Sequence, residues 1–327
     1  MRIPTISVVM SCYNAERWVV QAVESVLTQS FRDFELIAIN DGSRDTTPEL
    51  LRSFAQADER VVAHDKVNTG LADSLNIGLG LARGVWIARL DADDISAPER
   101  LARQLAFTSE HEDIVLLGSG FHEIDQDGRV IATHSYPTSH PALLARLTHM
   151  RGFPPHSSAF FRREVALNLG GYRPQVHRAE DWDMWLRLSE KGGLASLTDP
   201  LVSIRRHAGQ ISQDAAGERQ LADAYAAATC FFLRRSGIAD PLDGPGAQGF
   251  LDWIEQRMGE TGVFERRRLW VAARNRAFTG PSRARGLLGF AADLLKSGYA
   301  GPLLAEKFSG SGLPQRLAAE WAGRRQA

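Results

Sequence analysis

Two carboxylates separated by one residue are the first candidates for chemistry. Asp91-Ala92-Asp93 follows residues 85–90, an apolar run that predicts a strand, and precedes a predicted helix. Carboxylates at such a strand end could share Mn²⁺ or Mg²⁺, hard cations that prefer oxygen ligands and leave positions for water or phosphate. Such a cation would neutralise a departing diphosphate. Considered alone, however, the pattern more often marks a helix cap beside solvated turn residues.

Polar and aromatic residues also follow three earlier predicted strands. Ser11 and Tyr13 lie at the end of the first strand, where the ring could stack on a base and the hydroxyl could bond its edge or a ribose. Asp41 ends the second strand and could accept a hydrogen bond from a base N–H. Asn68 and Gly70 follow the third, and Gly70 would let the backbone approach a ligand closely. The alternative for Tyr13 is a packing role in the core. The alternative for Asp41, Asn68 and Gly70 is that they form ordinary turns.

A pair of acids begins a later predicted helix. Glu180 and Asp181 precede a helical pattern in which Asp183 and Arg187 are spaced as an i,i+4 pair. The free N–H groups and dipole of a helix start keep a carboxylate ionised, as a general base requires. Routine first-turn acids are the alternative.

A histidine follows the last predicted strand. His207 comes directly after Arg205-Arg206, and a neutral imidazole there could complete a metal site. A solvated basic strand end is the alternative.

The elements that must position these residues alternate between strand and helix over the first hundred residues. This alternation predicts a mainly parallel, doubly wound sheet, in which ligands bind outside the carboxyl ends of the strands. Capping boxes are predicted at Thr46 with Glu49 and at Ser96 with Glu99. Asp127-Gly128 predicts a hairpin turn, and the chain after about residue 215 has only helical patterns. The predicted strands are residues 5–11, 34–40, 60–64, 85–90, 114–119 and 201–205.

Composition narrows the class of protein. The chain has 327 residues, of which 44% are hydrophobic and 24% charged, with a formal net charge of -1. Such a charge gives no global field for nucleic acid. Two cysteines predict no disulfide framework, and no stretch is typical of a signal peptide or a membrane span. We expect a cytoplasmic protein. The sequence leaves open whether it contacts the inner face of the cell membrane and whether it forms a homodimer.

The motifs, taken in order, resemble those of glycosyltransferase family 2. The resemblance covers about residues 4–212 and is carried by five stretches: Ser-Val-Val-Met-Ser-Cys-Tyr-Asn, Ser-Val-Leu-Thr-Gln-Ser-Phe-Arg-Asp-Phe-Glu-Leu, Asn-Asp-Gly-Ser-Arg-Asp, Ala-Arg-Leu-Asp-Ala-Asp-Asp-Ile-Ser and Glu-Asp-Trp-Asp-Met-Trp-Leu-Arg-Leu. Two positions depart from the usual pattern. Asn40 stands where an Asp is common, and Cys12 is an unusual neighbour for Tyr13.

The resemblance implies an α/β protein of the GT-A fold: a Rossmann-like mixed sheet flanked by helices, here with a helical C-terminal extension. It implies a nucleoside-diphosphate sugar donor, Mn²⁺ or Mg²⁺, and inversion at the anomeric carbon. By position, Ser11, Tyr13 and Asp41 match the base-binding residues, and Asp91 and Asp93 match the ribose- and metal-binding motif. Asp181 matches the catalytic base, with Glu180 beside it, and His207 matches a further metal ligand. Asn68, Gly70 and Ala92 complete the expected nucleotide contacts.

These observations predict a glycosyltransferase of the hexosyltransferase type. Residues 1–105 would form the nucleotide-sugar-binding half, 106–212 the acceptor-binding half with the base, and 213–327 a helical region. The donor is expected to be UDP-linked, and the acceptor a hydroxyl of a glycan or lipid-linked saccharide in cell-surface polysaccharide synthesis. One alternative is a nucleotidyltransferase, which needs a Gly-rich basic loop where this chain has Ser11-Cys12-Tyr13-Asn14. The other is a non-catalytic sugar-nucleotide-binding protein.

Overall fold

The chain divides into two compact units, which we describe separately. A computed structural model describes residues 3–207, 217–268 and 312–324. The first unit comprises Met1–Leu147 with Arg151–Gln210, and the second comprises Thr148–Met150 with Ile211–Ala327.

The first half of the sheet is parallel, as the strand and helix alternation predicts. In β1, β2 and β4, continuous apolar runs bury their side chains on both faces of the sheet, a pattern typical of covered parallel sheets. β1 lies between β2 and β4, and β3 pairs with β2. Because all four strands run in one direction, their carboxyl ends meet at one edge. The strands are β1 (Ile6–Cys12), β2 (Phe34–Asp41), β3 (Val61–Lys66) and β4 (Trp86–Arg89).

The second half of the sheet is mixed. β8 is antiparallel to both β4 and β6, β9 returns parallel to β6, and β5 and β7 add antiparallel edges. The full order is β3-β2-β1-β4-β8-β6-β9-β5, with β7 paired to β6. The hairpin predicted at Asp127-Gly128 joins β6 to β7, and Gly128 has a positive φ of 87°. The strands are β5 (Ile95–Ser96), β6 (Ile114–Ile124), β7 (Val130–His134), β8 (Phe160–Arg162) and β9 (Gly193–Arg205).

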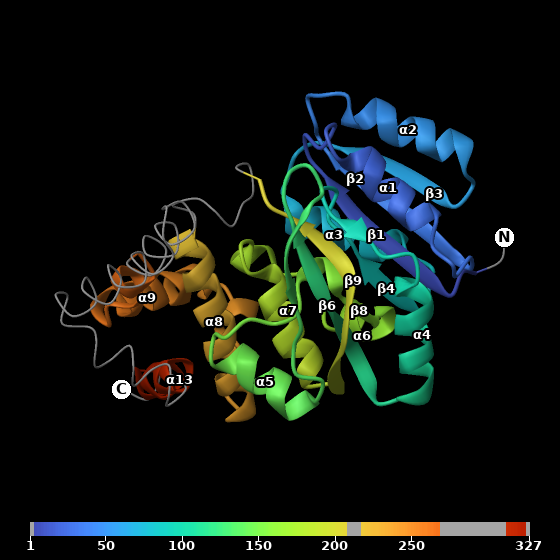
Figure 1. Cartoon of the computed structure of the whole chain (residues 1–327). Coiled ribbons are helices and arrows are strands. Elements are labelled where there is room, and N and C mark those ends of the chain that lie inside the picture. The colour runs from blue at the N-terminus through green and yellow to red at the C-terminus, as the bar shows by residue number, and fades with distance from the viewer. Residues whose placement is uncertain (1–2, 208–216, 269–311, 325–327) are drawn as a thin grey trace, which may run out of the picture. The chain divides into compact units, whose positions relative to one another are not determined.

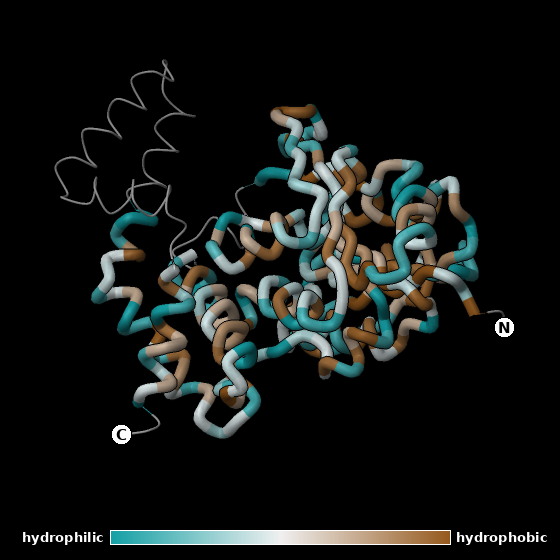
Figure 2. The backbone as a smooth tube through the Cα atoms, turned by 90° about the horizontal axis from the view of Figure 1, so that it is seen from below, coloured by the Kyte–Doolittle hydropathy of each residue, from teal (hydrophilic) through white to brown (hydrophobic). Residues whose placement is uncertain are grey.

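Helices cover both faces of the sheet (Figure 1). Met10 of β1 belongs to a core shared with α1, α2 and α4. Its neighbour Val9 faces the opposite way, towards Gly78 of α3, which in turn contacts α6. In Figure 2 the hydrophobic residues are concentrated in the central strands. The helices are α1 (Val19–Leu27), α2 (Thr47–Ala57), α3 (Leu71–Leu81), α4 (Arg100–Glu110), α5 (His140–Thr148), α6 (Arg163–Asn168) and α7 (Glu180–Ser189).

Both predicted capping boxes are wrong, and in each case a tertiary contact replaces the local one. Thr46 Oγ1 donates to Glu16 instead of capping α2. Ser96 lies in β5 opposite Val202, and α4 begins only at Arg100. Ser, Thr and acidic side chains have several partners within reach, so their local hydrogen-bonding pattern is easily overridden.

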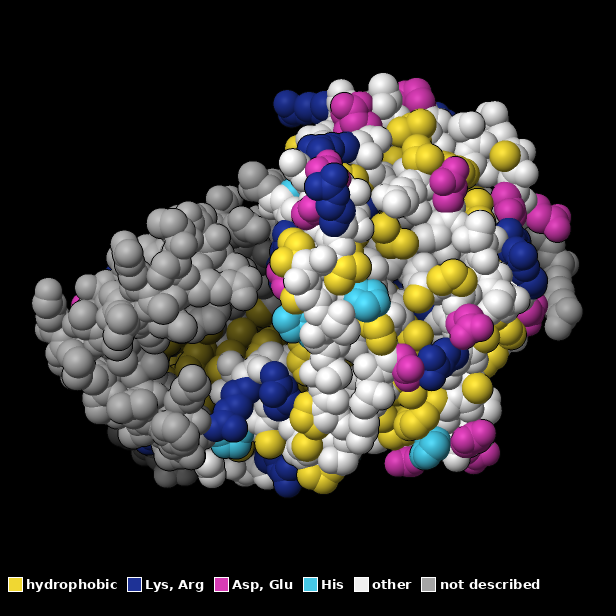
Figure 3. All heavy atoms as spheres, in the orientation of Figure 1, with side chains coloured by type: hydrophobic (Ala, Val, Ile, Leu, Met, Phe, Trp, Pro, Cys, Tyr) yellow, Lys and Arg dark blue, Asp and Glu magenta, His cyan; other side chains and the backbone are white. Residues whose placement is uncertain are grey.

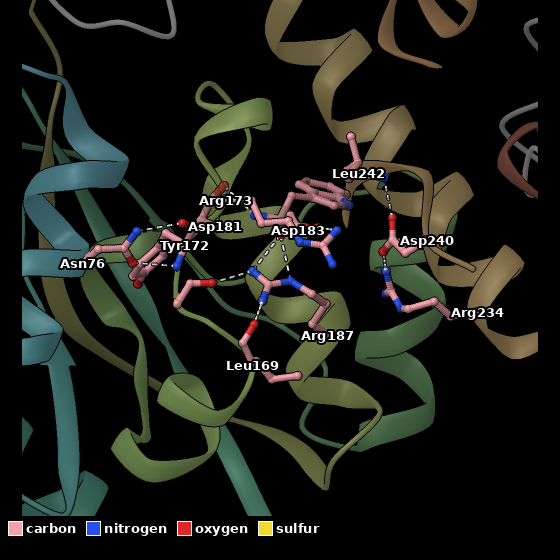
Figure 4. Close-up of polar contacts among 12 residues, drawn as sticks. Asn76, Leu169, Tyr172, Arg173, Asp181, Asp183, Arg187, Arg234, Asp240 and Leu242 are labelled. Atoms are coloured by element: carbon pink, nitrogen blue, oxygen red, sulfur yellow. Dashed lines mark hydrogen bonds and ion pairs between the residues drawn. The ribbon is translucent and has the colours of Figure 1, made fainter. Parts of the chain in front are cut away.

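The second unit is helical throughout its described residues. It contains α8 (Gly217–Arg235), α9 (Ala247–Glu260) and α13 (Leu313–Arg324). α8 contacts both other helices, and Trp253 and Trp321 pack 5.0 Å apart between α9 and α13. Asp240 accepts from Leu242 N and pairs with Arg234, which ties the end of α8 to the next turn (Figure 4). None of the described helices is both long and apolar enough to cross a membrane.

Candidate active site

The predicted nucleotide residues meet at the carboxyl ends of β1, β2 and β3. Asn14, with a φ of 48°, links the first two loops: its Oδ1 accepts from Arg44 N at 2.9 Å, and its N–H donates to Ser43 Oγ at 3.0 Å. Asn14 therefore bridges the loops that follow β1 and β2. Ser11 is partly buried, and Tyr13 has 51% of its surface exposed, so that its ring is accessible to a planar ligand.

Asp41 organises the loop after β3. Its carboxylate accepts from Lys66 Nζ at 2.5 Å, from Thr69 N at 2.9 Å and from Gly70 N at 3.0 Å. Gly70 has a φ of 98°, which few residues other than glycine adopt. Asn68 is exposed in the same loop, against Gly42 of the β2 turn. The structure thus brings Asp41, Asn68 and Gly70 together. It also shows that Asp41 holds the loop through both of its oxygens.

The acidic triplet lies at the end of β4, as predicted, and a serine distant in the sequence binds it. Ser157 Oγ lies 2.8 Å from Asp91 Oδ2 and 2.6 Å from Asp94 Oδ2, and it accepts from Asp91 N at 3.0 Å. One hydroxyl hydrogen can serve only one of the two carboxylates. Burial raises the pKa of Asp94 well above its usual range, with Asp93 adding to the effect, so Asp94 can carry the second proton.

Asp91 is held on its other oxygen by Arg89. Arg89 Nη2 donates to Asp91 Oδ1 at 2.5 Å, while 37% of the Asp91 side chain stays exposed. Burial works to raise the pKa of Asp91, but Arg89 and His156 outweigh it and hold that pKa below its usual value. Asp91 is therefore ionised, oriented and accessible. Its neighbour Ala92 is buried.

Asp93 and His207 come together from opposite ends of the first unit. His207 Nε2 lies 2.8 Å from Asp93 Oδ2, and the His207 ring packs on Trp18 with centroids 4.2 Å apart. Burial raises the pKa of Asp93, and the charge of Asp91 adds to the effect, so a nearby cation would stabilise both carboxylates. Carboxylate oxygen and imidazole nitrogen are suitable ligands for Mn²⁺.

The described side chains supply only part of the ligand set that a metal ion needs. No cluster of three or more His, Cys, Asp or Glu side chains arranged to hold a metal occurs among the described residues. A cation held by Asp93, His207 and Asp91 would need other ligands, and Mg²⁺ or Mn²⁺ sites commonly take them from water and phosphates.

Glu180 and Asp181 begin α7, as predicted. Asp181 is partly exposed, and its Oδ1 accepts from Trp182 N at 2.7 Å. Burial raises the pKa of Asp181 to about 6, and the negative charge of Asp91 adds to the rise. Burial and the charge of Asp181 raise the pKa of Glu180 well above its usual range. Burial therefore raises the pKa of both acids, and that of Asp181, at about 6, leaves it ionised at neutral pH.

Residues 169–172 form a latch between α7 and α3 (Figure 4). Arg187 pairs with Asp183 and donates to the carbonyl oxygens of Leu169 and Gly171 at 2.9 and 2.7 Å. Asn76 of α3 binds the same segment from the other side: its Nδ2 donates to Tyr172 O and its Oδ1 accepts from Tyr172 N, both at 2.7 Å. Residues 169–172 thus connect α7, the helix of Asp181, to α3.

Sequence reasoning missed Arg89, Ser157 and His156. Arg89 left a visible signal, because a charged residue inside an apolar strand needs a partner. Ser157 and His156 lie in a short 3-10 turn (His156–Ser158), and nothing in their local sequence distinguishes them.

Comparison with known proteins supports one family. The family model of glycosyl transferase family 2 matches residues 7–170, about half of the chain. The putative glycosyltransferase EpsE of Bacillus subtilis (strain 168) is 36% identical over 193 residues, which cover 58% of this chain and 68% of that protein. The O-antigen biosynthesis glycosyltransferase WbnJ of Escherichia coli is 29% identical over 184 residues, covering 56% and 71%.

Solved structures share the fold at low sequence identity. S. aureus TarS 1–349 in complex with UDP-GlcNAc gives a TM-score of 0.57 at 19% identity, over 70% of this chain and 66% of that one. The mannosyltransferase PcManGT from Pyrobaculum calidifontis, in complex with GDP-Man and Mn²⁺, gives 0.52 at 19% identity, over 97% and 85%. The sheet order and flanking helices of the first unit are those of the GT-A fold, as predicted. The chain belongs to glycosyl transferase family 2 and is a glycosyltransferase.

Proposed function

We propose that the chain is an inverting glycosyltransferase that moves a sugar from a UDP-linked donor to a hydroxyl of a glycan or lipid-linked acceptor in cell-surface polysaccharide synthesis. One observation carries the proposal. Asp181, a partly exposed carboxylate with a pKa raised to about 6, interacts electrostatically with Asp91 of the strand-end motif. A base at α7 and a donor site at β4 are the two parts that a single displacement requires.

The donor would bind along the carboxyl ends of β1 to β4. Tyr13 would stack on the base, beside Ser11, while Asp41 would fix the loop that carries Asn68 and Gly70 against the nucleotide. Asp91 and the backbone of Ala92 would hold the ribose. Residues 1–105 then form the donor half, and residues 106–212 form the acceptor half with the base.

Asp93, His207 and Asp91 would hold Mn²⁺ or Mg²⁺, which would supply charge neutralisation for the departing diphosphate. PcManGT, which shares the fold, was solved in complex with GDP-Man and Mn²⁺, and TarS in complex with UDP-GlcNAc. We infer the same class of donor here. The name of WbnJ places that relative in O-antigen biosynthesis, which supports a polysaccharide acceptor. We propose that the reaction takes place in the cytoplasm, beside the membrane.

In the proposed step, Asp181 accepts the proton of the acceptor hydroxyl as its oxygen bonds to the anomeric carbon. The bond from that carbon to the diphosphate oxygen breaks on the opposite face, which inverts the configuration. The bonding electrons leave with the nucleoside diphosphate. Burial and the charge of Asp181 raise the pKa of the adjacent Glu180 and so disfavour a second negative charge beside the base.

The test is Asp181→Asn, assayed for UDP release and saccharide product with a panel of UDP- and GDP-sugars and oligosaccharide acceptors. We expect transfer to fall at least about a thousandfold, because a general base and its orientation are lost together. Nucleotide affinity, measured by calorimetry, should change less than about threefold, because Asp181 does not contact the nucleotide in this scheme.

Asp199→Asn is the matched control, because Asp199 is a surface carboxylate paired with Arg103. It should keep full activity. Near-normal turnover in Asp181→Asn would contradict the role of Asp181 as the general base. Pyrophosphate release from a nucleoside triphosphate would instead indicate a nucleotidyltransferase, and binding without turnover of any donor would indicate a non-catalytic protein.

A further inference from the structure

His156 has one ring nitrogen in a hydrogen bond and the other available to a ligand. It begins the 3-10 turn of residues 156–158 and is partly exposed, whereas the two serines of that turn are buried. Its Nε2 lies 3.0 Å from the hydroxyl oxygen of Tyr172. Among the described residues, its Nδ1 has no hydrogen-bond partner. The side chain therefore keeps one hydrogen-bonding atom that the protein itself does not use.

The imidazole ring is held in place by two other rings. It meets Trp185 of α7 edge-on, with centroids 5.5 Å apart and an interplanar angle of 84°, and its centroid lies 5.6 Å from that of Tyr172. Tyr172 is fixed in turn, because Asn76 bonds both of its backbone groups (Figure 4). A side chain held in this way loses little conformational freedom when a ligand binds, so its hydrogen bond is pre-organised.

The neighbours of His156 belong to the two parts of the site that must meet at the sugar. Ser157, the next residue, holds the strand-end motif through its Oγ, 2.8 Å from Asp91 Oδ2. Trp185 lies one helical turn after Asp181, on the same face of α7. In a single displacement, the transferred sugar lies between the departing diphosphate and the base. His156 is therefore linked by contacts to both elements that border the sugar.

The other polar side chains of the turn are used within the protein. Ser157 Oγ is bound to two carboxylates of the strand-end motif. Ser158 Oγ donates to Pro155 O at 2.8 Å and accepts from Ser119 N at 3.3 Å. Of the three side chains in this turn, His156 is the one that can bond a substrate.

A sugar hydroxyl is a suitable partner for this ring. Burial lowers the pKa of His156 well below its usual range, and the charge of Arg89 adds to the effect, so the imidazole is neutral at neutral pH. A neutral imidazole offers either an N–H or a lone pair at Nδ1, depending on which atom holds the proton in the bond to Tyr172. A hydroxyl both donates and accepts, so it can pair with either form.

We propose that His156 binds one hydroxyl of the transferred sugar through Nδ1 and so helps to select the donor. This inference rests on the proposed function and adds to it a residue that determines specificity. The ligand is a neutral sugar carried on a nucleoside diphosphate, and the group recognised is one of its ring hydroxyls.

Two amide side chains separate the roles of the two nitrogens. The amide of asparagine is attached to Cγ, as Nδ1 is, whereas the amide of glutamine extends one bond further, towards the position of Nε2. His156→Asn therefore keeps a hydrogen-bonding group near Nδ1 and loses the bond to Tyr172, and His156→Gln does the reverse. Ser158→Ala is the matched control, because it removes a buried hydrogen bond from the same turn and leaves His156 unchanged.

The experiment compares a natural donor with analogues that each lack one hydroxyl. In the full chain, kcat/KM is measured for the nucleotide sugar that the wild type transfers best and for each of its monodeoxy analogues. The ratio of the two values is the penalty for losing that hydroxyl. In His156→Gln we expect the penalty at one ring position to fall about fivefold, as for the loss of one neutral hydrogen bond. His156→Asn should keep most of the penalty, and Ser158→Ala should keep all of it while its Tm falls.

Three results would overturn the inference. One is an unchanged penalty at every ring position in His156→Gln, and another is a change seen only with deoxygenated acceptors. The third is an equal loss of kcat/KM for all donors in proportion to the loss of Tm, because this would show a purely structural role. If His156→Gln does not fold, His156→Phe takes its place, since it keeps the ring and lacks both nitrogens.

Failure of the wild type to transfer any sugar would contradict the proposed function instead. The role of His156 is then decided by calorimetry, from the difference in binding free energy between UDP-sugars and UDP alone. We expect this difference to become smaller in His156→Gln and to stay the same in Ser158→Ala. No such difference in the wild type, or an unchanged one in His156→Gln, would contradict the role of His156 itself.

Discussion

At the scale of single residues, the site depends on shared protons and shared charges. Ser157 contacts both Asp91 and Asp94, which leaves one carboxylate to keep its proton. Glu180 and Asp181 are adjacent, and burial raises the pKa of both, that of Asp181 to about 6 and that of Glu180 well above its usual range. Neighbouring carboxylates in different environments commonly divide acid and base roles in this way.

The pH dependence of the reaction follows from Asp181. Its pKa is raised to about 6 by burial, and a general base works only when ionised, so activity is retained above that pH and lost below it. We expect kcat/KM to fall about tenfold for each pH unit below about 6. A pH–rate series with a UDP-sugar checks this. Asp199→Asn is the control, and its kcat/KM should fall over the same pH range as that of the wild type. A flat profile down to pH 4 would contradict the assignment of Asp181.

At the scale of elements, residues 169–172 link α7 to α3 and are held from two sides. Arg187 binds the carbonyl oxygens of Leu169 and Gly171, and Asn76 binds both backbone groups of Tyr172. The glycines in this turn are required for different reasons. Gly170 and Gly171 have φ values of 82° and 73°, but only at Gly171 would a Cβ meet another atom, 2.4 Å from Asn76 Oδ1.

This pair of glycines allows a controlled test of the latch. Both Gly170→Ala and Gly171→Ala carry the strain of a positive φ, of order 1 kcal/mol, but only Gly171→Ala also displaces Asn76. We expect Gly171→Ala to be the more destabilising by about 1–3 kcal/mol in urea unfolding, because it breaks buried hydrogen bonds. It should also lower kcat, whereas Gly170→Ala should not.

The double variant Gly171→Ala with Asn76→Ala identifies the cause. Removing Asn76 removes the clash, so the double variant should lose less free energy of unfolding than the sum of the losses in the two single variants. Additive losses would show that Gly171 and Asn76 act independently, which would contradict the latch.

At the scale of the whole molecule, seven short segments of the first unit converge on one edge of the sheet. They include the loops after β1 to β4, the turn at residues 156–158, the start of α7 and the end of β9. On the face of the first unit shown in Figure 3, acidic and basic side chains are interspersed, in agreement with the net charge of -1. Because no field of one sign covers that face, we expect charged ligands to be recognised locally, at the sheet edge.

Ligand-dependent stability tests this convergence without an activity assay. A ligand at 100 times its Kd stabilises the folded state by about 2.7 kcal/mol. We expect UDP with Mn²⁺ to raise Tm more than UDP alone. Asp93→Asn and His207→Ala should remove the Mn²⁺-dependent part and keep the UDP part.

His111→Ala is the control, because His111 is exposed at the end of α4 and packs on Phe107. An Mn²⁺-dependent rise in Tm that survives in both ligand variants would show that the cation binds elsewhere.

Much of the fold could be predicted from the sequence because its signals are local. Apolar β-branched runs predicted β1 to β4 with ends within about two residues, the usual uncertainty of element boundaries, and the sequence also predicted that helices alternate with these strands. Parallel strands place their carboxyl ends together, so the strand pattern by itself assigns Asp41, Asp91 and Tyr13 to one edge. The roles of these residues in binding and catalysis stay predictions.

Tertiary structure alone decided which side chains touch. Ser157 and Asp91 are 66 residues apart, His207 and Asp93 are 114 apart, and Asn76 and Tyr172 are 96 apart. No periodicity encodes such pairs, because a side-chain hydrogen bond depends on packing that forms after the local elements exist. The same reason explains why the capping boxes at Thr46 and Ser96 failed. The sequence alone determined a strand-end acidic motif in an α/β sheet. The tertiary structure added the contacts of Ser157, Arg89 and His156, which lower the pKa of Asp91 in that motif.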